Sequence, residues 1–330
     1  MGATVTTAAT KEKTWGGGED IRPLGASYGK MMMWYFILSD SLTFAGFLAA
    51  YGFTRFKFMD SWPIADEVFN HFPFLHGVDA PMYYVALMTF ILIFSSVTMV
   101  LAVDAGHQMK QKKVAVYMLL TILGGMIFVG SQAWEWKNFI GGSYGAIETK
   151  GGEILQFVDQ DGKRLALADF ADASITREDE TLTKSKGVWS MKGATQTSVS
   201  LEQVKAGLEN NPNVLIRTQF TNPENKHEKI VLSREESLAR ANDFSLVVEG
   251  ANLVRNEYGH KTFADLFFFI TGFHGFHVSV GIILNIIIFF NVLLGTYETR
   301  KSYEMVEKVG LYWHFVDLVW VFVFTFFYLV

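Results

Sequence analysis

The chain has 330 residues, of which 50% are hydrophobic and 15% aromatic, and its formal net charge is −5 at pH 7. Thirty Phe and eight Trp are too many for an ordinary soluble domain of this size. The mildly acidic balance excludes the basic surface of a nucleic-acid-binding protein, and the absence of Cys excludes disulfides and iron–sulfur clusters. A membrane protein is the class that remains.

Five apolar stretches are long enough to cross a bilayer, which takes about 20 mostly apolar residues. They are residues 31–51, 82–103, 114–136, 264–294 and 309–330, and a polar, Gly-rich tail of residues 1–30 precedes them. The sequence therefore predicts an all-α membrane protein with a bundle of five transmembrane helices. Helices 1–3 fall in residues 31–138, and helices 4 and 5 fall in residues 262–330.

Residues 139–261, between the third and fourth stretches, are polar and charged. The segment is too long for an ordinary connection, so we predict a small α+β insert domain. "EILQFVDQDGKRLALADF" predicts a hairpin around Asp161-Gly162, and "SVSLEQVKAGLENN" predicts a helix with Ser198 or Ser200 as its N-cap. "NVLIRTQF" and "KIVLS" predict further strands, and the insert shows no catalytic signature.

The distribution of Lys and Arg in the short segments predicts the orientation, because cytoplasmic loops carry an excess of these residues. One side has ten of them, namely Lys11, Lys13, Arg22, Lys30, Lys110, Lys112, Lys113, Arg300, Lys301 and Lys308. The other side has Arg55 and Lys57 in its one short loop. The N-terminus is therefore expected in the cytoplasm, and the insert and the C-terminus on the extracytoplasmic side.

Several ionisable or strongly polar residues fall inside the predicted spans. They are Asp40 in the first span, Gln132 and Glu135 in the third, His274, His277 and Asn285 in the fourth, and His314 and Asp317 in the fifth. Such groups are costly in a membrane and are kept where they face protein or water and find partners. They are therefore the candidate functional residues.

His274 and His277 are three residues apart, as are His314 and Asp317, so each pair shares one helix face. The spacing leaves three interpretations of the histidines open: hydrogen bonds that fix helix packing, ligation of haem or a metal, or a proton or ion pathway. Asp40 is open in a similar way. A buried carboxyl group can be structural, or it can carry a proton.

Four blocks occur in order on successive predicted helices: "FILSDSLTFAGF", "SQAWEW", "ITGFHGFHVSVG" and "LYWHFVDLVWVFVF". Together they resemble subunit III of haem-copper terminal oxidases, the family of the cytochrome c and quinol oxidases. The resemblance covers the five spans and leaves the insert unexplained. It implies a chain with no cofactor and no catalytic centre of its own, while haem and copper belong to partner subunits.

The resemblance also implies roles for particular residues. Asp40 falls at the family's intramembrane carboxylate. The polar residues of the family motifs are Gln132, Glu135, His274, His277, His314 and Asp317. Phospholipid is expected as a bound component, and Arg300 and Lys301 are the bases nearest to the expected headgroup position.

The implied function is an accessory subunit of a proton-pumping oxidase, most simply cytochrome c oxidase, in a bacterial inner membrane. Subunits I and II and membrane lipids are the expected partners. The insert is expected to contact subunit II, a cytochrome c domain or a neighbouring respiratory complex. The alternatives are a quinol oxidase subunit, a self-standing proton or ion transporter that uses Asp40 and the histidines, and a haem-bearing membrane anchor.

Overall fold

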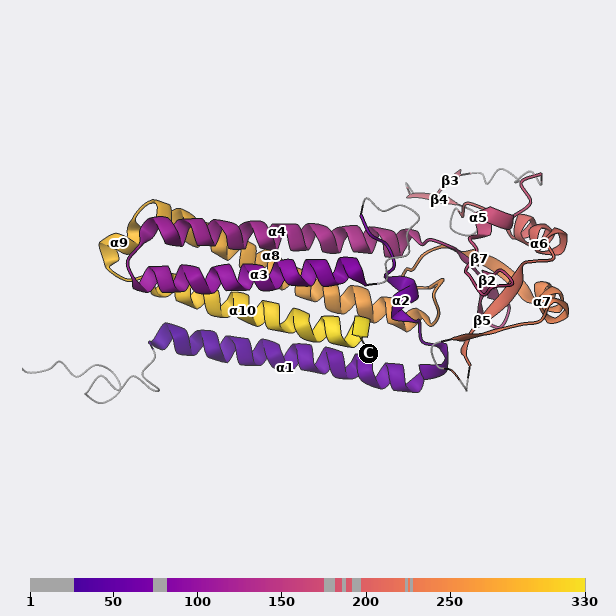
Figure 1. The fold of residues 1–330 in the computed structure, drawn as a ribbon, viewed down its shortest axis with the longest axis horizontal. Coiled ribbons are helices and arrows are strands. Elements are labelled where there is room, and N and C mark those ends of the chain that lie inside the picture. Colours follow the sequence, from indigo (N-terminus) through magenta and orange to yellow (C-terminus); the bar gives the residue numbers. More distant parts are fainter. Residues whose placement is uncertain are drawn as a thin grey trace, which may run out of the picture.

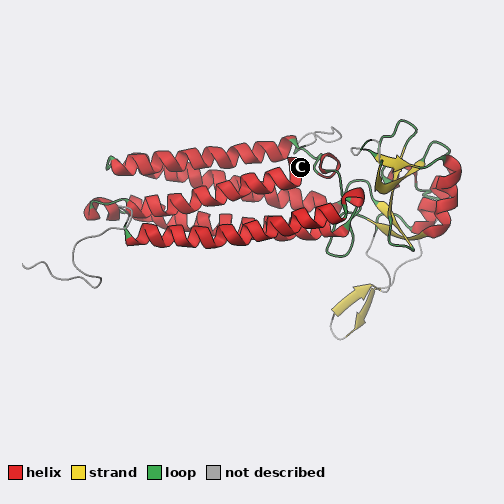
Figure 2. Ribbon diagram, turned by 90° about the horizontal axis from the view of Figure 1, so that it is seen from below, coloured by secondary structure: helices red, strands yellow, loops and turns green. Residues whose placement is uncertain are grey.

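The computed structural model describes residues 27–73, 82–174, 182–185, 188–191, 197–222, 225 and 228–329. Five long helices lie side by side in a bundle, and a small domain that contains a β-sheet lies at one end (Figure 1; Figure 2). Each of the five is long and apolar enough to cross a membrane. The helices are α1 (Tyr28–Lys57), α3 (Tyr83–His107), α4 (Gln111–Gly141), α8 (Lys261–Leu293) and α10 (Glu304–Phe324). The predicted fold class is therefore confirmed.

The helices extend past the apolar stretches into polar residues at both ends. The Ser27 side chain accepts a hydrogen bond from the Lys30 amide at the start of α1, and the last helix continues as a π-helix, Thr325–Leu329. Backbone hydrogen bonding does not stop where the hydrocarbon would end, so hydropathy marks the centre of a helix better than its ends. Most of the predicted tail, residues 1–30, lies outside the described residues, as does Val330.

Aromatic side chains and close glycine contacts hold the bundle together. Helix α1 packs against α8 and α10, and α4 packs against α3 and α8. The Trp313 ring of α10 is buried against Gly125 of α4, where an added Cβ would lie 2.5 Å from the ring. The Trp313 indole also donates to Ser95 Oγ of α3 at 3.1 Å. Small residues permit this close approach of membrane helices.

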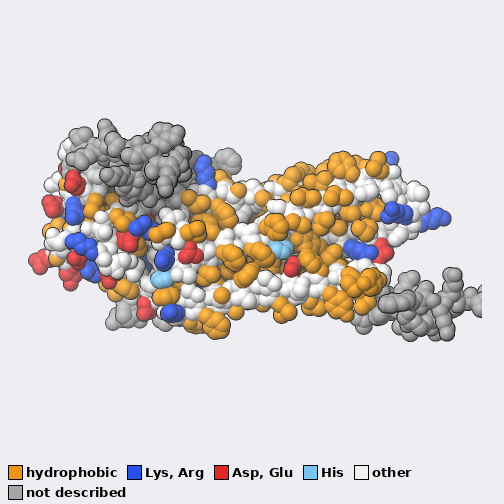
Figure 3. Space-filling view, turned by 180° about the vertical axis from the view of Figure 1, so that it is seen from behind, with side chains coloured by type: hydrophobic (Ala, Val, Ile, Leu, Met, Phe, Trp, Pro, Cys, Tyr) orange, Lys and Arg blue, Asp and Glu red, His pale blue; other side chains and the backbone are white. Residues whose placement is uncertain are grey.

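The outer surface of the bundle is apolar. On the face shown in Figure 3, hydrophobic side chains cover the helical part, and Lys, Arg, Asp and Glu gather mostly toward its two ends. Exposed apolar residues occur on every long helix, for example Leu42, Phe90, Leu123, Phe276 and Leu318. This distribution is that of helices surrounded by lipid, in which apolar residues face outward as well as inward.

The insert is a five-stranded antiparallel sheet with short helices. Its strands are β1 (Ala146–Thr149), β2 (Ile154–Val158), β5 (Leu215–Thr221), β6 (Lys229–Val231) and β7 (Phe244–Val248), in the spatial order β6-β5-β2-β1-β7. The remaining strands, β3 (Leu182–Ser185) and β4 (Val188–Met191), pair with each other. The helices of the insert are α5 (Leu167–Phe170), α6 (Leu201–Asn210) and α7 (Arg234–Arg240).

The two later strands and the helix predicted in the insert are confirmed as β5, β6 and α6. Ser200 caps α6 by accepting from the Gln203 amide at 3.3 Å. The predicted hairpin is wrong in its second arm. The chain turns at Asp161-Gly162, makes a single bridge from Val158 to Arg164, and then forms α5. The Leu165 amide also donates to the carbonyl oxygen of Phe157 at 2.9 Å. Farther along this edge β1 already pairs with Leu155 and Ile154, so the second arm cannot extend into a full strand.

The insert is closed at its base by the carboxylate of Glu257, which is fully buried. Four backbone N–H groups donate to it: those of Ser143 and Tyr144 to Oε1, and those of Gly145 and Gly250 to Oε2, at 2.5–3.3 Å. Gly250 has a φ of +66°, and a Cβ there would lie 1.9 Å from the carbonyl oxygen of Ile140. The segment that enters the insert and the segment that leaves it therefore both donate to the Glu257 carboxyl group.

A second contact fixes the sheet to the bundle. Glu67 lies on the short helix α2 (Ala65–Val68), which follows the turn η2 (Met59–Ser61) between α1 and α3. The Arg217 guanidinium of β5 donates to both carboxylate oxygens of Glu67, at 2.8 and 2.7 Å. Burial would raise the pKa of Glu67, but the hydrogen bonds from Arg217 and the charges of Lys229, Arg217 and Arg164 lower it below its usual value.

Candidate functional site: polar groups inside the bundle

Asp40 of α1 and His277 of α8 form a pair. Asp40 Oδ2 lies 3.3 Å from His277 Nε2, and the two side chains are 20% and 10% exposed. His277 Nδ1 lies 2.8 Å from the carbonyl oxygen of Phe273. A carbonyl oxygen only accepts, so Nδ1 must carry a hydrogen. Nε2 is therefore the nitrogen that faces the acid, and the pair can hold one shared proton.

His274 points in another direction and lies deeper. Its side chain is buried, and Nε2 donates to the carbonyl oxygen of Val316 on α10 at 3.0 Å. The ring packs against the rings of Phe128 and Trp320, whose centroids are 5.7 and 5.2 Å away. His274 and His277 thus lie three residues apart but contact different helices. The first contacts α4 and α10, and the second contacts α1.

His314 and Asp317 of α10 both face Ser96 of α3. The Ser96 hydroxyl lies 2.6 Å from His314 Nδ1 and also makes a hydrogen bond with Asp317. One hydroxyl can accept from the ring and donate to the carboxyl group at the same time. This pair therefore links α10 to α3. It does not join Asp40 and His277 in one polar layer.

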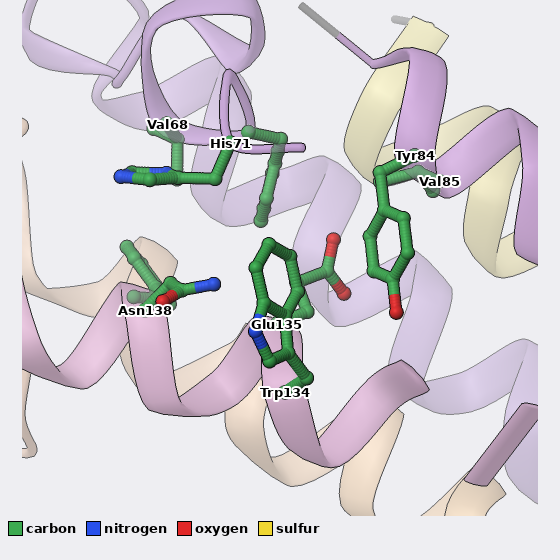
Figure 4. Close-up of a pocket in the computed structure, with 9 residues that line it drawn as sticks. Val68, His71, Tyr84, Val85, Trp134, Glu135 and Asn138 are labelled. Atoms are coloured by element: carbon green, nitrogen blue, oxygen red, sulfur yellow. The ribbon is translucent and has the colours of Figure 1, made fainter. Parts of the chain in front are cut away.

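Gln132 and Glu135 of α4 lie toward the end of the bundle that carries the insert. Glu135 Oε2 accepts from Gln132 Nε2 at 2.8 Å and from the Tyr328 hydroxyl at 2.9 Å. Beside them is a narrow hollow, shown in Figure 4, whose lining includes Val68, His71, Tyr84, Trp134, Glu135 and Asn138. Tyr328 was not among the residues that the sequence pointed to, because a tyrosine near a helix end also fits an interface position.

Arg300 and Lys301 lie at the opposite end of the bundle. Arg300 ends the short helix α9 (Thr296–Arg300), and both side chains are exposed. Lys301 lines a polar hollow together with Lys30, His107, Tyr303 and Glu307. Lys30 is already paired with Glu307, at 2.6 Å. The hollow has charges of both signs, so its lining does not single out an anionic ligand.

Six of the eight predicted polar residues thus fall into three separate groups: the Asp40–His277 pair, the His314–Ser96–Asp317 group and the Gln132–Glu135–Tyr328 group. His274 and Asn285 lie outside these groups and donate to backbone carbonyl oxygens, those of Val316 and Gly281. Within the part of the chain that the structure describes, no three His, Asp or Glu side chains come together as a possible metal site. His274 Nε2 and His277 Nδ1 each donate to a carbonyl oxygen. These two nitrogens are therefore occupied by hydrogen.

A comparison with known protein families finds a match for part of the chain. The sequence model of cytochrome c oxidase subunit III matches residues 257–330. Over these residues the chain is similar to that family. The matched segment begins at Glu257, where the chain returns from the insert, and it contains both helices α8 and α10.

Individual relatives agree with this assignment. The chain is 42% identical over 81 residues to the probable cytochrome c oxidase subunit 3 of Rickettsia conorii. It is 42% identical over 67 residues to cytochrome c oxidase subunit 3 of Synechocystis, and 46% over 63 residues to that of Marchantia polymorpha. These alignments cover 19–22% of this chain and 23–29% of the relatives. The chain thus spans less than a third of the length of these curated relatives.

The subunit III segment contains His274, His277, His314 and Asp317, whereas Asp40, Gln132 and Glu135 lie outside it. The structure brings the two parts together, because Asp40 contacts His277 and Glu135 contacts Tyr328. Sequence reasoning missed Ser96, Tyr328, Glu67 and Glu257. Ser96 and Tyr328 resemble ordinary helix residues, and the partners of the two glutamates lie far away in sequence.

Proposed function

We propose that this chain is the accessory subunit III of a haem-copper terminal oxidase, and specifically of a cytochrome c oxidase. The observation that carries the proposal is the family match over α8 and α10, the two helices that hold most of the intramembrane polar residues. The five apolar helices of the bundle support a multi-pass membrane protein. In this proposal the oxygen chemistry takes place in subunit I, and this chain contributes no catalytic group.

The proposed setting is a bacterial inner membrane with the N-terminus in the cytoplasm. The excess of Lys and Arg in the tail and in the loops at residues 104–113 and 295–308 supports this orientation. In the structure, the insert and the end of the last helix lie at one end of the bundle, away from the start of α1 (Figure 1). The insert then faces the periplasm.

Haem and copper are assigned to the partner subunits. His274 and His277 are packing residues in this proposal, since each already donates to a backbone carbonyl from one ring nitrogen. Replacing either with Ala should leave the haem content of the assembled complex unchanged. Loss of one haem at unchanged subunit content would contradict the assignment.

Phospholipid is the other proposed ligand, with Arg300 and Lys301 as headgroup contacts. Both side chains are exposed at the end of the bundle that the proposed orientation places in the cytoplasm. The Asp40–His277 pair is proposed to support sustained proton uptake by the oxidase. The pair lies on α1 and α8, two helices that are apolar enough to cross a membrane, which supports this role.

The insert is proposed to contact subunit II, a cytochrome c domain or a neighbouring respiratory complex. Its attachment supports this role, because Glu257 closes its base and Arg217 joins its sheet to Glu67 between α1 and α3. A domain that is held at two points presents its surface at a fixed height above the membrane. A loop that only joined two helices would need neither contact.

Gentle detergent purification of the tagged chain tests the assignment. The expected result is a complex with a haem absorption spectrum in which subunits I and II accompany this chain. A chain that purifies without a haem-bearing partner would contradict the proposal. A haem spectrum that stays with the isolated chain would instead support the membrane-anchor alternative.

A self-standing proton transporter is the second candidate, and the Asp40–His277 contact at 3.3 Å favours it. Reconstitution of the purified chain alone into vesicles with a pH-sensitive dye separates the two functions. An accessory subunit should give no proton flux above that of Asp40→Asn. A flux that the substitution abolishes would support the transporter.

The role of the insert is tested by a deletion that spares its base. Ala146 and Val248 are paired across β1 and β7, so residues 147–247 can be replaced by Asn-Gly, a two-residue turn. This variant retains Glu257 and its four backbone donors. The expected result is an assembled oxidase that loses a companion protein or oxidises cytochrome c more slowly. Unchanged companions and kinetics would show that the insert is a passive elaboration.

A further inference from the structure

Glu135 is the most deeply enclosed acid of the three groups described above. It is 6% exposed, and its partners Gln132 and Tyr328 both donate to the same oxygen, Oε2. The other oxygen, Oε1, is buried and has no hydrogen-bond partner within the described part of the chain. A buried oxygen without a partner requires a physical explanation.

Among the residues that the structure describes, no group with a formal positive charge contacts Glu135. Gln132 and Asn138 share its helix, Tyr328 comes from the end of the last helix, and Tyr84 and His71 line the adjoining hollow. Lys137, although nearby in sequence, is exposed. An ionised carboxylate in such surroundings is costly. A proton on the carboxyl group removes that cost.

The hydrogen-bond pattern also places the proton. Oε2 accepts two hydrogen bonds, which leaves it no lone pair for a hydrogen of its own. Oε1 accepts no hydrogen bond from the described residues. A neutral Glu135 would therefore hold its hydrogen on Oε1. That hydrogen then needs an acceptor.

Figure 4 shows Glu135 and Asn138 beside the hollow, with His71 across from Asn138. The Asn138 Nδ2 group is buried and, among the described residues, has no acceptor. The hollow measures about 10 Å³, close to the smallest space in which a water molecule fits. One water could accept from both Asn138 Nδ2 and Glu135 Oε1. One water molecule would thus give a hydrogen-bond partner both to the Asn138 amide and to the Glu135 carboxyl group.

The hollow lies toward the solvent at the insert end. His71 Nε2 lies 2.8 Å from the Ser143 hydroxyl, in an exposed contact. Polar side chains therefore lie at the rim of the hollow as well as at its inner end. The apolar bundle encloses the other sides through residues such as Val68, Val85 and Phe139.

We propose that Glu135 is a proton-binding site that exchanges its proton with the solution at the insert end through a water molecule beside Asn138. On release, the O–H bond at Oε1 breaks, the water becomes hydronium, and a carboxylate remains that Gln132 and Tyr328 stabilise. Uptake reverses these steps, and no oxidant or reductant takes part. The site is independent of the oxidase assignment, because it needs only residues of this chain.

Infrared difference spectroscopy of the purified full-length protein tests the site. A protonated carboxyl group has a carbonyl stretch that an ionised one lacks. Glu135→Gln should remove one such band, and Glu148→Gln, which changes an acid paired with Arg255 on the insert, should leave it. In deuterium oxide the band should shift within seconds. Asn138→Leu fills the hollow and should slow that shift at least tenfold while the band remains.

Two results would overturn the proposal. A spectrum of Glu135→Gln that retains every carboxylic-acid band would show that Glu135 is ionised. A Glu135 band that does not shift over hours in deuterium oxide would show a sealed, structural acid. If Glu135→Gln does not accumulate, Tyr328→Phe identifies the band, because loss of one hydrogen bond to Oε2 must raise its frequency. An unmoved set of bands would then reject the site.

Discussion

Buried acids in the helical bundle and at the base of the insert have different kinds of partners. Glu257 accepts four backbone N–H groups, and Glu67 accepts both arms of the Arg217 guanidinium. In the bundle, Glu135 has two neutral side-chain donors on one oxygen, and Asp40 faces a histidine. The contacts at the base of the insert therefore supply each acid with several donors, whereas the bundle supplies its acids with few.

The reason lies in the backbone. In a helix, every interior N–H already donates to a carbonyl four residues earlier, but a carbonyl oxygen can accept a second bond. Side-chain donors in the bundle use this, as when Ser41 donates to Ile37 O and Thr89 to Val85 O. Side-chain acceptors find no free backbone N–H group in a helix interior. The described bundle accordingly contains buried oxygens that accept no hydrogen bond, on Asp40, Gln132, Glu135, Asn285 and Asp317; that of Asp40 lies 3.3 Å from His277 Nε2.

Removal of the Glu257 carboxylate should have the largest effect. Glu257→Ala leaves four buried N–H groups without an acceptor, and each such group costs about 1–3 kcal/mol. The base of the insert should open, so amides of residues 143–145 and 250 should exchange hydrogen far faster in deuterium oxide. Glu249→Gln, at an exposed acid that accepts from Ser198, is the control. Unchanged protection in Glu257→Ala would show that the base does not depend on this anion.

The contact between Arg217 and Glu67 should come next. Loss of one partner of a buried ion pair costs about 3–5 kcal/mol, and less here because Glu67 is 23% exposed at its side chain. Arg217→Met and Glu67→Gln should each loosen the contact between α2 and the sheet, and so raise the rate of protease cleavage in these two elements. The double variant should be less sensitive than the sum of the two single ones predicts. Strict additivity would mean that the two groups do not interact.

Lys229 should make the stability of the insert depend on pH. Its ammonium group donates to Tyr258 O and is buried beside Gln156 and Arg217, and burial lowers its pKa to about 7. The unfolded chain, whose Lys pKa is about 10.4, binds one more proton here between about pH 7 and pH 10. Stability of the insert should therefore rise with pH across this window.

Thermal unfolding followed by circular dichroism measures this effect. Below about pH 7 both states are protonated at Lys229, so this residue adds no pH dependence there. Lys229→Met should flatten the rise in melting temperature between about pH 7 and pH 10, whereas Lys163→Met, at an exposed site, should not. A slope that Lys229→Met leaves intact must come from another group.

Asp40→Asn should have the smallest effect on the initial rate of oxygen reduction. The substitution removes the acid that faces His277 but no bond-making group, so the complex should assemble with its haem and start at nearly the normal rate. Endurance during turnover or lipid retention should change instead. A fall of more than about a hundredfold, roughly 2.7 kcal/mol of barrier, would place Asp40 on an obligatory proton path.

Chemical labelling compares Asp40 with the other two acids of the bundle. A hydrophobic carbodiimide modifies protonated acids in apolar surroundings, and the family resemblance predicts that it labels Asp40 before Glu135 and Asp317. Mass spectrometry of the labelled chain ranks the three sites. Labelling of Glu135 or Asp317 ahead of Asp40 would contradict this order.

Features that depend only on residues close together in the chain could be predicted from the sequence. Five apolar stretches of bilayer length predicted the five long helices, and of the two serines predicted as the cap of α6, Ser198 and Ser200, it is Ser200 that caps the helix. The order of the motif blocks predicted the subunit III family that matches residues 257–330. Length, hydropathy and capping act within one or two turns of chain, so one sequence is enough to reveal them.

Which polar groups contact each other could be seen only in the folded chain. Arg217 reaches Glu67 across 150 residues, and Tyr328 reaches Glu135 across 193. The i, i+3 spacing placed His274 and His277 on one face, yet α10 takes one ring and α1 the other. A helix in lipid is apolar on nearly every side, so its sequence does not show which side faces which neighbour. The packing of the helices supplies that information and, with it, the partners of each buried charge.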